Sequence, residues 1–235
     1  MKKIIIIGAG AMGSAFAVPC LENKNDVTLI GTHLEDDLIN NIKTNKNFHP
    51  ALNVELPAKL KVEKYDKLKV ILEEGVDIIV AGVSSVGIKW FVNQITSNYK
   101  TNHSIILLTK GLAIEDNDLI TLSDKIKKLL KVEGHAKVNI SAIKGPCLAA
   151  GLANKMRTGT VIANPNIKET EKLKKIISTD YYSTEISDDL TGIELSGAIK
   201  NIYSMLIGAS EGLSNSNAPK EIQSKYYLNT SASLI

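Results

Sequence analysis

Three glycines near the N-terminus, Gly8, Gly10 and Gly13, have the spacing G-x-G-x-x-G. Glycines so spaced let a chain turn tightly, let backbone amides approach a pyrophosphate, and let the next helix pack closely on the preceding strand. The helix N-terminus adds unpaired N–H groups and the positive end of the helix dipole. We therefore expect Gly8, Gly10, Ala11, Met12 and Gly13 to form the phosphate-binding loop of a dinucleotide site. A βα turn that binds nothing is the alternative.

Two lysines are candidates for chemistry beside such a loop. Lys110 follows the apolar run 104–109 and precedes Gly111, so its ammonium would lie at the end of a buried strand and could bind a phosphate or an anionic substrate. Lys200 lies among small residues on a long predicted helix, where a ligand could approach it and exchange a proton. The alternatives are a solvated loop lysine for Lys110 and, for Lys200, a lysine that snorkels at the edge of an apolar helix.

The ends of two other predicted strands provide further candidates. After the strand 26–30, a dinucleotide site usually has an acid for the ribose 2′-OH or a basic group for a 2′-phosphate. This chain has Thr32 and His33 there, and both could donate to a phosphate. The strand tip lacks an acid and therefore favours NADP over NAD, with dual use open; a plain surface histidine fits His33 equally well. Ser85 follows the strand 76–83 and could contact the cofactor, although Ser84 or Ser85 could instead cap the next helix.

The elements that position these residues alternate along the chain. Apolar β-branched runs predict buried strands, and apolar residues at helical spacing predict amphipathic helices. Strands are expected at 4–7, 26–30, 76–83, 104–109, 138–142, 159–163 and 181–187; helices at 11–21, 34–44, 66–74, 119–130, 168–177 and 190–211, with one more around Trp90; and a loop at 45–58. The helix 34–44 has acids at 35–37, which suit its dipole. The order predicts an α/β, doubly wound Rossmann-type sheet in residues 1–188, followed by the start of an all-α domain in 189–235.

Composition excludes several classes of function. The chain has 235 residues, a formal net charge of +3, 44% hydrophobic and 23% charged residues, as in ordinary globular proteins. Its scattered lysines form no basic stripe, so we expect no nucleic-acid partner. Cys20 and Cys147 fit neither a disulfide framework nor a metal site, and the histidines do not cluster. With no targeting signal and no apolar run long enough for a membrane span, we expect a cytoplasmic protein without a metal.

Three stretches together resemble the NAD(P)-dependent glycerol-3-phosphate dehydrogenase family. They are IIIIGAGAMGSAFA at 4–17, LLTKGL at 107–112 and GIELSGAIKNIYSMLIGASEGL at 192–213, with a looser match in KGPCLAAGLANKMRTGTVIA at 144–163. The segment ELSGAIKN is the most specific, because it joins a generic dinucleotide fold to one substrate class. The resemblance implies hydride transfer with NADP or NAD between sn-glycerol 3-phosphate and dihydroxyacetone phosphate, feeding glycerophospholipid synthesis.

The resemblance also implies roles for single residues. Lys200 matches the catalytic general acid/base, Asn201 an active-site residue beside it, and Lys110 the lysine that contacts both cofactor and substrate. Gly145 falls where the family binds substrate, and Ala149 where it contacts the cofactor.

The chain departs from the family pattern at three further positions. Cys147, in the substrate site, stands where Ser is usual and hydrogen-bonds less well than a hydroxyl. Met12 replaces a common aromatic residue, and Thr32 replaces an arginine found in many members.

The C-terminal part departs most. Family members continue well beyond Leu213, with a segment that completes the helical domain and supplies an acid and an arginine for the substrate phosphate. We therefore expect 189–235 to be an incomplete domain whose exposed apolar face favours a homodimer or instability. Two other functions remain open: another reductase of the same fold group, of the ketopantoate or 6-phosphogluconate type, or a non-catalytic dinucleotide-binding module.

Overall fold

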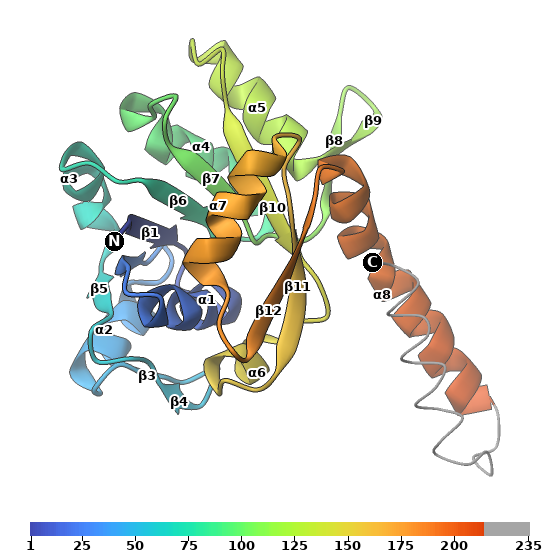
Figure 1. Ribbon diagram of the computed structural model, residues 1–235, viewed down its shortest axis with the longest axis horizontal. Coiled ribbons are helices and arrows are strands. Elements are labelled where there is room, and N and C mark those ends of the chain that lie inside the picture. Colours follow the sequence, from blue (N-terminus) through green and yellow to red (C-terminus); the bar gives the residue numbers. More distant parts are fainter. Residues whose placement is uncertain (214–235) are drawn as a thin grey trace.

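The computed structural model describes residues 1–213, except for the side chains of Asn201, Ile207 and residues 209–213. The strands of its main sheet are β1 (Lys3–Ile7), β2 (Asp26–Ile30), β5 (Lys61–Glu63), β6 (Ile78–Ala81), β7 (Ser104–Leu107), β10 (Asn139–Lys144), β11 (Thr158–Ala163) and β12 (Tyr182–Ser187). Within these residues they form one eight-stranded sheet of order β12-β11-β10-β7-β6-β1-β2-β5 (Figure 1). Six neighbouring strands of this sheet, β5, β2, β1, β6, β7 and β10, run parallel. At the other end of the sheet, β11 is antiparallel to β10, and β12 is parallel to β11.

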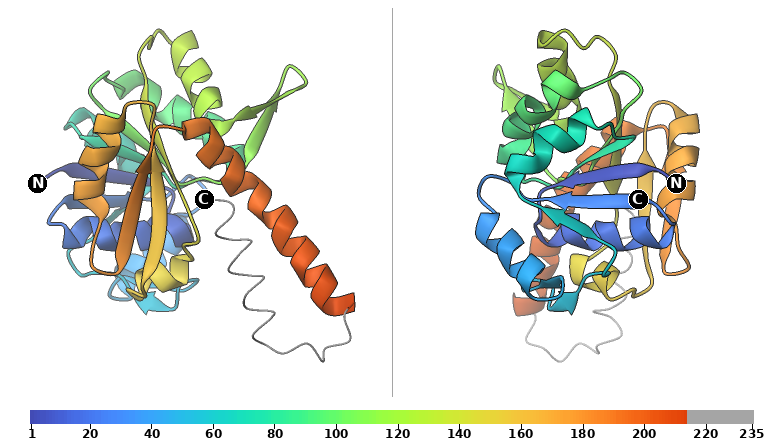
Figure 2. Two further views of the ribbon diagram at one scale, coloured as in Figure 1. Left: turned by 45° about the vertical axis from the view of Figure 1, so that its right-hand side comes forward. Right: turned by 90° about the vertical axis from the view of Figure 1, so that its left-hand side faces the viewer.

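Helices cover both faces of this sheet (Figures 1 and 2). One face packs against α1 (Ala11–Glu22), α2 (Asp36–Thr44), α6 (Ala149–Ala153) and α7 (Ile167–Ile177), and the other against α3 (Leu68–Glu73), α4 (Ile88–Ile95) and α5 (Leu122–Val132). In β1, Ile4 and Ile6 belong to the first core and Ile5 and Ile7 to the second. A strand covered on both sides needs an unbroken apolar run. The predicted doubly wound α/β sheet is confirmed.

Three local predictions were wrong. The predicted loop 45–58 contains the short strands β3 (Phe48–His49) and β4 (Val54–Glu55), which form a hairpin. Residues 119–121 of the predicted helix 119–130 belong to β9 (Asp118–Thr121), paired with β8 (Leu112–Glu115). The helix α5 begins only after Thr121, because that side chain caps it by accepting a hydrogen bond from the Asp124 amide at 3.1 Å. The predicted helix 66–74 is divided into a 3₁₀ turn, η1 (Tyr65–Lys67), and α3.

The last described element, α8 (Leu190–Leu213), confirms the helix predicted over 190–211. Its first turns pack on the sheet with Leu190 and Glu194 buried, and it then extends away from the body as a rod (Figure 2). Residues 214–235 of the predicted helical domain lie outside the described part, so the boundary at 188/189 stays a prediction. No helix within residues 1–213 is long and apolar enough to cross a membrane.

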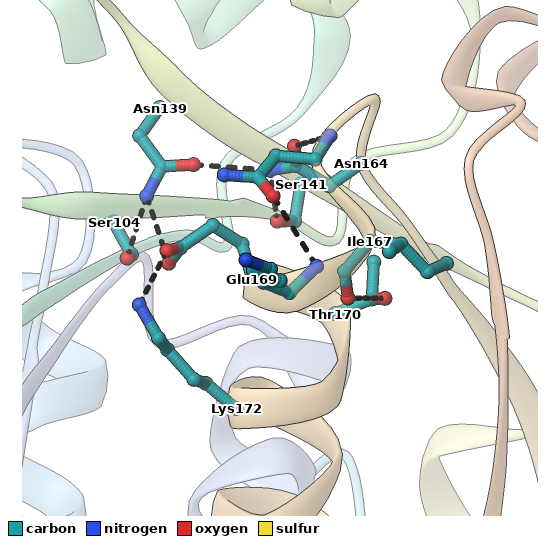
Figure 3. A network of polar contacts seen from close by, with 10 residues as sticks. Ser104, Asn139, Ser141, Asn164, Ile167, Glu169, Thr170 and Lys172 are labelled. Carbon is teal, nitrogen blue, oxygen red and sulfur yellow. Dashed lines mark hydrogen bonds and ion pairs between the residues drawn. The ribbon is translucent and has the colours of Figure 1, made fainter.

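A polar network fastens β11 and α7 to β10 at the edge where the parallel strands begin (Figure 3). The side-chain amide of Asn164 donates to Asn139 Oδ1 at 3.0 Å and to Ser141 Oγ at 2.8 Å. The carboxylate of Glu169 accepts from the side-chain amide of Asn139 at 3.2 Å and from the Lys172 ammonium at 2.6 Å. Because buried polar groups need partners, this network specifies how the antiparallel strand is placed. It leaves the opposite edge of the sheet for the candidate site.

Candidate active site

The predicted site residues follow strands that end at one edge of the sheet. Gly8 follows β1, Thr32 follows β2, Ser85 follows β6, Lys110 follows β7 and Gly145 follows β10. The carboxyl ends of parallel strands share an edge, and β1 lies between β2 and β6, so the strand order reverses beside Gly8. In doubly wound sheets, ligands bind at such a reversal. The fold therefore brings candidates that follow five separate strands to one edge of the sheet, the crevice edge of a doubly wound fold.

The three motif glycines differ in what surrounds them. Gly8 has φ +110°, and a Cβ there would lie 2.7 Å from the backbone of Gly82. A Cβ on Gly13 would collide with the carbonyl oxygen of Gly8. At Gly10, in contrast, an added Cβ would meet nothing within 4 Å in the described part of the chain. Two glycines are thus imposed by packing, whereas the third leaves open space in front of α1.

This open space fits a phosphate group. Gly10 is the N-cap of α1, no described side chain caps the helix, and no acidic residue lies in its first turn. The first amides of a helix lack intrahelical acceptors, and the dipole favours an anion there. The N-terminus of α1 therefore offers uncapped donors, positive potential and room, which are the properties that a dinucleotide pyrophosphate needs.

Three side chains, those of Ser14, His49 and Glu35, hold the backbone of Ala9 in the glycine loop by hydrogen bonds. Its carbonyl oxygen accepts from Ser14 Oγ at 3.0 Å and from His49 Nε2 at 2.9 Å. The other ring nitrogen of His49 accepts from the Leu52 amide at 3.3 Å, which leaves the proton on Nε2. The Ala9 amide donates to Glu35 Oε2 at 3.0 Å. The loop is consequently preorganised, and the buried His49 is a supporting residue that no sequence motif marked.

Glu35 also places its carboxylate at the end of β2, the strand tip at which the sequence has no acid. The same oxygen, Oε2, accepts from the Thr32 amide at 2.7 Å, so one carboxylate bridges the glycine loop and the end of β2. From the sequence, Glu35 is expected only among the acids 35–37 at the start of a helix. A signal did exist, because Glu35 lies about twenty residues beyond the motif, the usual spacing for a ribose-binding acid.

His33 lies in a small aromatic cluster next to this carboxylate. Its exposed ring lies 5.1 Å from Trp90 between ring centroids, and Trp90 lies 5.5 Å from Tyr65. The three rings come from the end of β2, from η1 and from α4. The exposure of His33 fits both a plain surface histidine and a phosphate donor, so both alternatives stay predictions.

Ser85 lies in a 3₁₀ turn, η2 (Ser85–Gly87), between β6 and α4. The alternative in which Ser84 or Ser85 caps the next helix is wrong, since neither η2 nor α4 has a side-chain cap and the N-cap of α4 is Gly87. A Cβ on Gly111 would lie 3.6 Å from Ser85 Cβ. Ser85 is therefore adjacent to the loop that carries Lys110.

A buried lysine that the sequence analysis did not select ties the two neighbouring strands together. Lys144 ends β10 with only 5% of its surface exposed, and its ammonium donates to the carbonyls of Leu107 at 3.1 Å and Thr109 at 2.8 Å. Burial lowers the pKa of Lys144 to about 8; Glu194 opposes the shift, and Lys110 adds to it. Lys144 thus positions the end of β7 immediately before Lys110.

Lys110 and Lys200 are close enough for their charges to interact. Loss of hydration lowers the pKa of Lys110 first, the positive charge of Lys200 lowers it further, and Cys147 opposes both. Lys200 is half-buried on α8. One turn earlier, Gly197 packs on Lys144, where an added Cβ would lie 3.0 Å from Lys144 Cδ. This close contact brings α8 to the crevice; the side chain of Asn201 lies outside the described part.

The segment after β10 completes the edge. A Cβ on Gly145 would lie 2.8 Å from the Thr160 Cα, so packing against β11 also requires this glycine. Cys147 is buried, which raises the pKa of its thiol despite Thr158 and Lys110. Ala149 begins α6, the helix that packs against α1. Ala149 is half-buried, as is Met12 in α1 itself. Gly145 and Cys147 therefore lie on the Lys110 side of the crevice, and Ala149 on the α1 side.

Glu194 is a second buried group that sequence reasoning missed. Only 1% of its surface is exposed, and its Oε1 accepts from the Ser123 amide at 3.1 Å. Its Oε2 has no hydrogen-bond partner among the residues that the structure describes, and its negative charge acts on Lys144. The available signal was positional, because Glu194 lies on the helical stripe of Leu190 and Gly197.

Comparisons with known proteins agree with this arrangement. A sequence model described as NAD-dependent glycerol-3-phosphate dehydrogenase N-terminus matches residues 3–170. A curated relative from Archaeoglobus fulgidus, named NADP(+)-dependent glycerol-3-phosphate dehydrogenase, is 32% identical over 209 residues, which are 89% of this chain and 60% of the relative. Another from Mesoplasma florum, named glycerol-3-phosphate dehydrogenase [NAD(P)+], is 32% identical over 202 residues, 85% and 58% of the two chains. The chain thus spans less than two thirds of either relative.

Solved structures match over nearly the whole chain. A glycerol-3-phosphate dehydrogenase from Coxiella burnetii superposes with a TM-score of 0.79 at 23% identity, covering 99% of this chain and 67% of that one. The enzyme from Plasmodium falciparum gives a TM-score of 0.79 at 20% identity, covering 100% and 65%. At these identities the likeness shows the fold. Together with the match over residues 3–170, it leads to the conclusion that the chain belongs to the NAD(P)-dependent glycerol-3-phosphate dehydrogenase family.

Proposed function

We propose that this chain carries the dinucleotide-binding part of an oxidoreductase that interconverts sn-glycerol 3-phosphate and dihydroxyacetone phosphate with NAD(P), feeding glycerophospholipid synthesis. The observation that carries the proposal is that α8 packs through Gly197 on Lys144, which holds the end of β7, so that Lys200 and Lys110 lie near enough for their charges to interact at the sheet edge of the glycine loop. Two ammonium groups from β7 and α8 beside a phosphate-binding loop suit an anionic substrate next to a dinucleotide. The names of the relatives from A. fulgidus and M. florum support the same activity.

The cofactor would lie along the crevice edge. Amides of Gly10, Ala11 and Met12 would bind its pyrophosphate, supported by the tight packing of Gly8 and Gly13. Further contacts would come from the ends of other strands and from the start of α6, namely from Thr32, His33, Ser85, Lys110 and Ala149. A bound NAD(P)H would supply the hydride for carbonyl reduction.

Residues of the chain would handle the proton and the developing charge. Lys200 would donate a proton to the alkoxide during reduction and accept it during oxidation. Lys110 would orient the substrate and stabilise negative charge on its oxygen. Asn201, Gly145 and Cys147 would complete the substrate side; the Cys147 thiol, kept protonated by its raised pKa, is a weak donor.

The test is oxidation of NADH and NADPH with dihydroxyacetone phosphate by the wild-type chain and by Lys200→Ala. We expect Lys200→Ala to lose turnover by about 10²-fold or more, the usual contribution of a general acid, with the cofactor Kd almost unchanged. Lys175→Ala, which removes an exposed lysine on α7, is the control for net charge and should keep full activity.

Other results would select other functions. A Lys200→Ala variant with most of its activity would refute the role of Lys200. Tight cofactor binding without wild-type turnover would favour a non-catalytic module, and turnover of ketopantoate or 6-phosphogluconate alone would favour another reductase of the fold group.

We further propose that the exposed apolar surface of α8 favours a homodimer. Ile202, Met205 and Leu206 are 53%, 67% and 58% exposed, which is unusual for neighbouring large apolar side chains. Light scattering that finds a stable monomer would refute this. The two cysteines are free and buried, and they suit the reducing cytoplasm in which we place the protein; cell fractionation tests that location.

A further inference from the structure

The side chain of Lys144 contacts both segments that lead to the site lysines, namely the end of β7 and the helix α8. Its ammonium donates to the carbonyl of Leu107 at 3.1 Å and to that of Thr109 at 2.8 Å, directly before Lys110. Its methylene stem lies against α8, because a Cβ added at Gly197 would lie 3.0 Å from Lys144 Cδ and 3.2 Å from Cγ. The position of each segment is therefore tied to this one side chain.

The backbone from which this side chain extends is itself fixed. Lys144 is the last residue of β10, where it pairs with Val161 of β11. Its carbonyl oxygen accepts a hydrogen bond from Thr160 Oγ1 at 2.7 Å. Only 5% of the residue is exposed, so the ammonium cannot turn to water unless its neighbours move. Lys144 is thus a rigid link from the sheet to the carbonyls that precede Lys110.

An ammonium at this position costs stability. Taking a charge out of water is unfavourable, and a buried charge can often be replaced by an apolar side chain of similar volume without loss of stability. Burial lowers the pKa of Lys144 to about 8, although the buried carboxylate of Glu194 opposes the shift. A contribution to stability therefore does not account for the ammonium of Lys144.

We propose that Lys144 is a positioning residue of the proposed reaction, whose two hydrogen bonds hold the end of β7 so that Lys110 faces the anionic substrate. The inference rests on the proposed function and adds a side chain that does not itself touch the substrate. Lys110 is followed by Gly111, which has φ +124° and, as a glycine, restrains the chain little. The direction of Lys110 therefore depends on the residues before it, whose carbonyls Lys144 holds.

The experiment measures how fast acetic anhydride acetylates Lys110 between pH 7 and 10, in the whole chain without ligands, by mass spectrometry of its peptides. Lys144→Met keeps an apolar stem and loses the ammonium, and Lys175→Met on the surface of α7 is the matched control. In the wild type, loss of hydration lowers the pKa of Lys110. We expect Lys144→Met to let Lys110 turn to water, which raises that pKa and slows acetylation at pH 8 about threefold or more. Lys175→Met should leave the rate unchanged.

Two further variants separate position from charge and from misfolding. Lys144→Leu also removes the ammonium and should slow the acetylation of Lys110 to the same extent. Glu194→Gln alters the charge beside Lys144 but leaves both hydrogen bonds of Lys144 in place, so the rate should not change. Urea unfolding identifies the folded variants. A folded Lys144 variant with the wild-type rate overturns the inference, and so does an equal change in Glu194→Gln, which would assign the effect to charge.

Turnover of dihydroxyacetone phosphate separates this inference from the proposed function. In an active chain, Lys144→Met should raise KM about tenfold or more and lower kcat less, because Lys110 orients the substrate whereas Lys200 is still placed by α8. Wild-type kinetics in Lys144→Met keep the activity and overturn the inference. A wild type without turnover refutes the proposed activity, whereas slower acetylation of Lys110 in Lys144→Met still supports the positioning role.

Discussion

The two sides of the crevice are built from different kinds of contact. On the glycine side, neutral backbone atoms touch: Gly8 packs on Gly82, and Gly13 packs on the Gly8 carbonyl. On the lysine side, charged groups from distant segments influence one another: the charge of Lys110 acts on the buried Lys144, and the charge of Lys200 acts on Lys110. Packing volume organises the glycine contacts, which hydrogen bonds from Glu35 and His49 support, whereas charge organises the lysine side.

This difference predicts opposite sensitivities. A surface of close backbone contacts should tolerate changes of pH and fail when a methyl group is added. A group of neighbouring ammonium groups that includes the buried Lys144 should tolerate small changes of shape and respond to pH, because the protonated forms are destabilised by loss of hydration and by one another. Substitutions on each of the two sides, with urea unfolding measured at more than one pH, test this comparison.

The largest effect should come from Gly13→Ala. The new Cβ collides with the Gly8 carbonyl, so backbone must shift at the centre of the fold, and we expect a loss of about 2–3 kcal/mol of unfolding free energy. Urea unfolding at neutral pH measures it, and the loss should be the same at pH 6 and 9. A fully stable Gly13→Ala protein would contradict the packing argument.

A pH-dependent effect of comparable size is expected for Lys144→Met. The folded-state pKa of Lys144, about 8, lies below its ordinary value of 10.5, so between these values the unfolded chain binds more protons. Stability therefore rises with pH through this window, and the cost of burying the charge, on the order of 3 kcal/mol, applies in full only below about pH 8.

Urea unfolding at several pH values between 7 and 10 measures this dependence. The wild type should gain stability relative to Lys144→Met as the pH rises. Parallel curves for the two proteins would show that the Lys144 charge costs nothing in the folded state.

The smallest effect on stability should be that of Gly10→Ala. Its backbone, with φ −62° and ψ 170°, is accessible to alanine, and the added Cβ meets nothing in the described residues. We expect less than about 1 kcal/mol of change in unfolding free energy, but a loss of roughly tenfold or more in NADH affinity, because the methyl group fills the space proposed for the pyrophosphate. Unchanged affinity would place the nucleotide elsewhere.

Sequence reasoning succeeded where a short stretch carries its own explanation. The four isoleucines 4–7 and the glycines after them are strand, turn and helix in one local pattern, and the helix 190–211 has a clear apolar period. It failed for the hairpin β3–β4 and for the start of α5, where strands of two to four residues have almost no periodic signal.

It also missed residues whose importance depends on long-range contacts. Glu35 reaches back 26 residues to Ala9, and His49 reaches back 40. Lys144 donates to carbonyls 35 and 37 residues earlier. Apart from the spacing of Glu35 from the glycine motif, nothing in the sequence distinguishes these side chains from surface residues, because their partners are adjacent only in the folded chain.

The sequence by itself determined the doubly wound sheet, the glycine loop and the family, because buried strands, tight turns and motif spacing are local properties of the chain. Only the tertiary structure decided which polar groups surround the crevice: the Glu35 carboxylate between two amides, the buried Lys144 on which the charge of Lys110 acts, and Glu194 on the inner face of α8. Burial and charge contacts arise when distant segments pack together. The electrostatics of the site therefore depend on the fold.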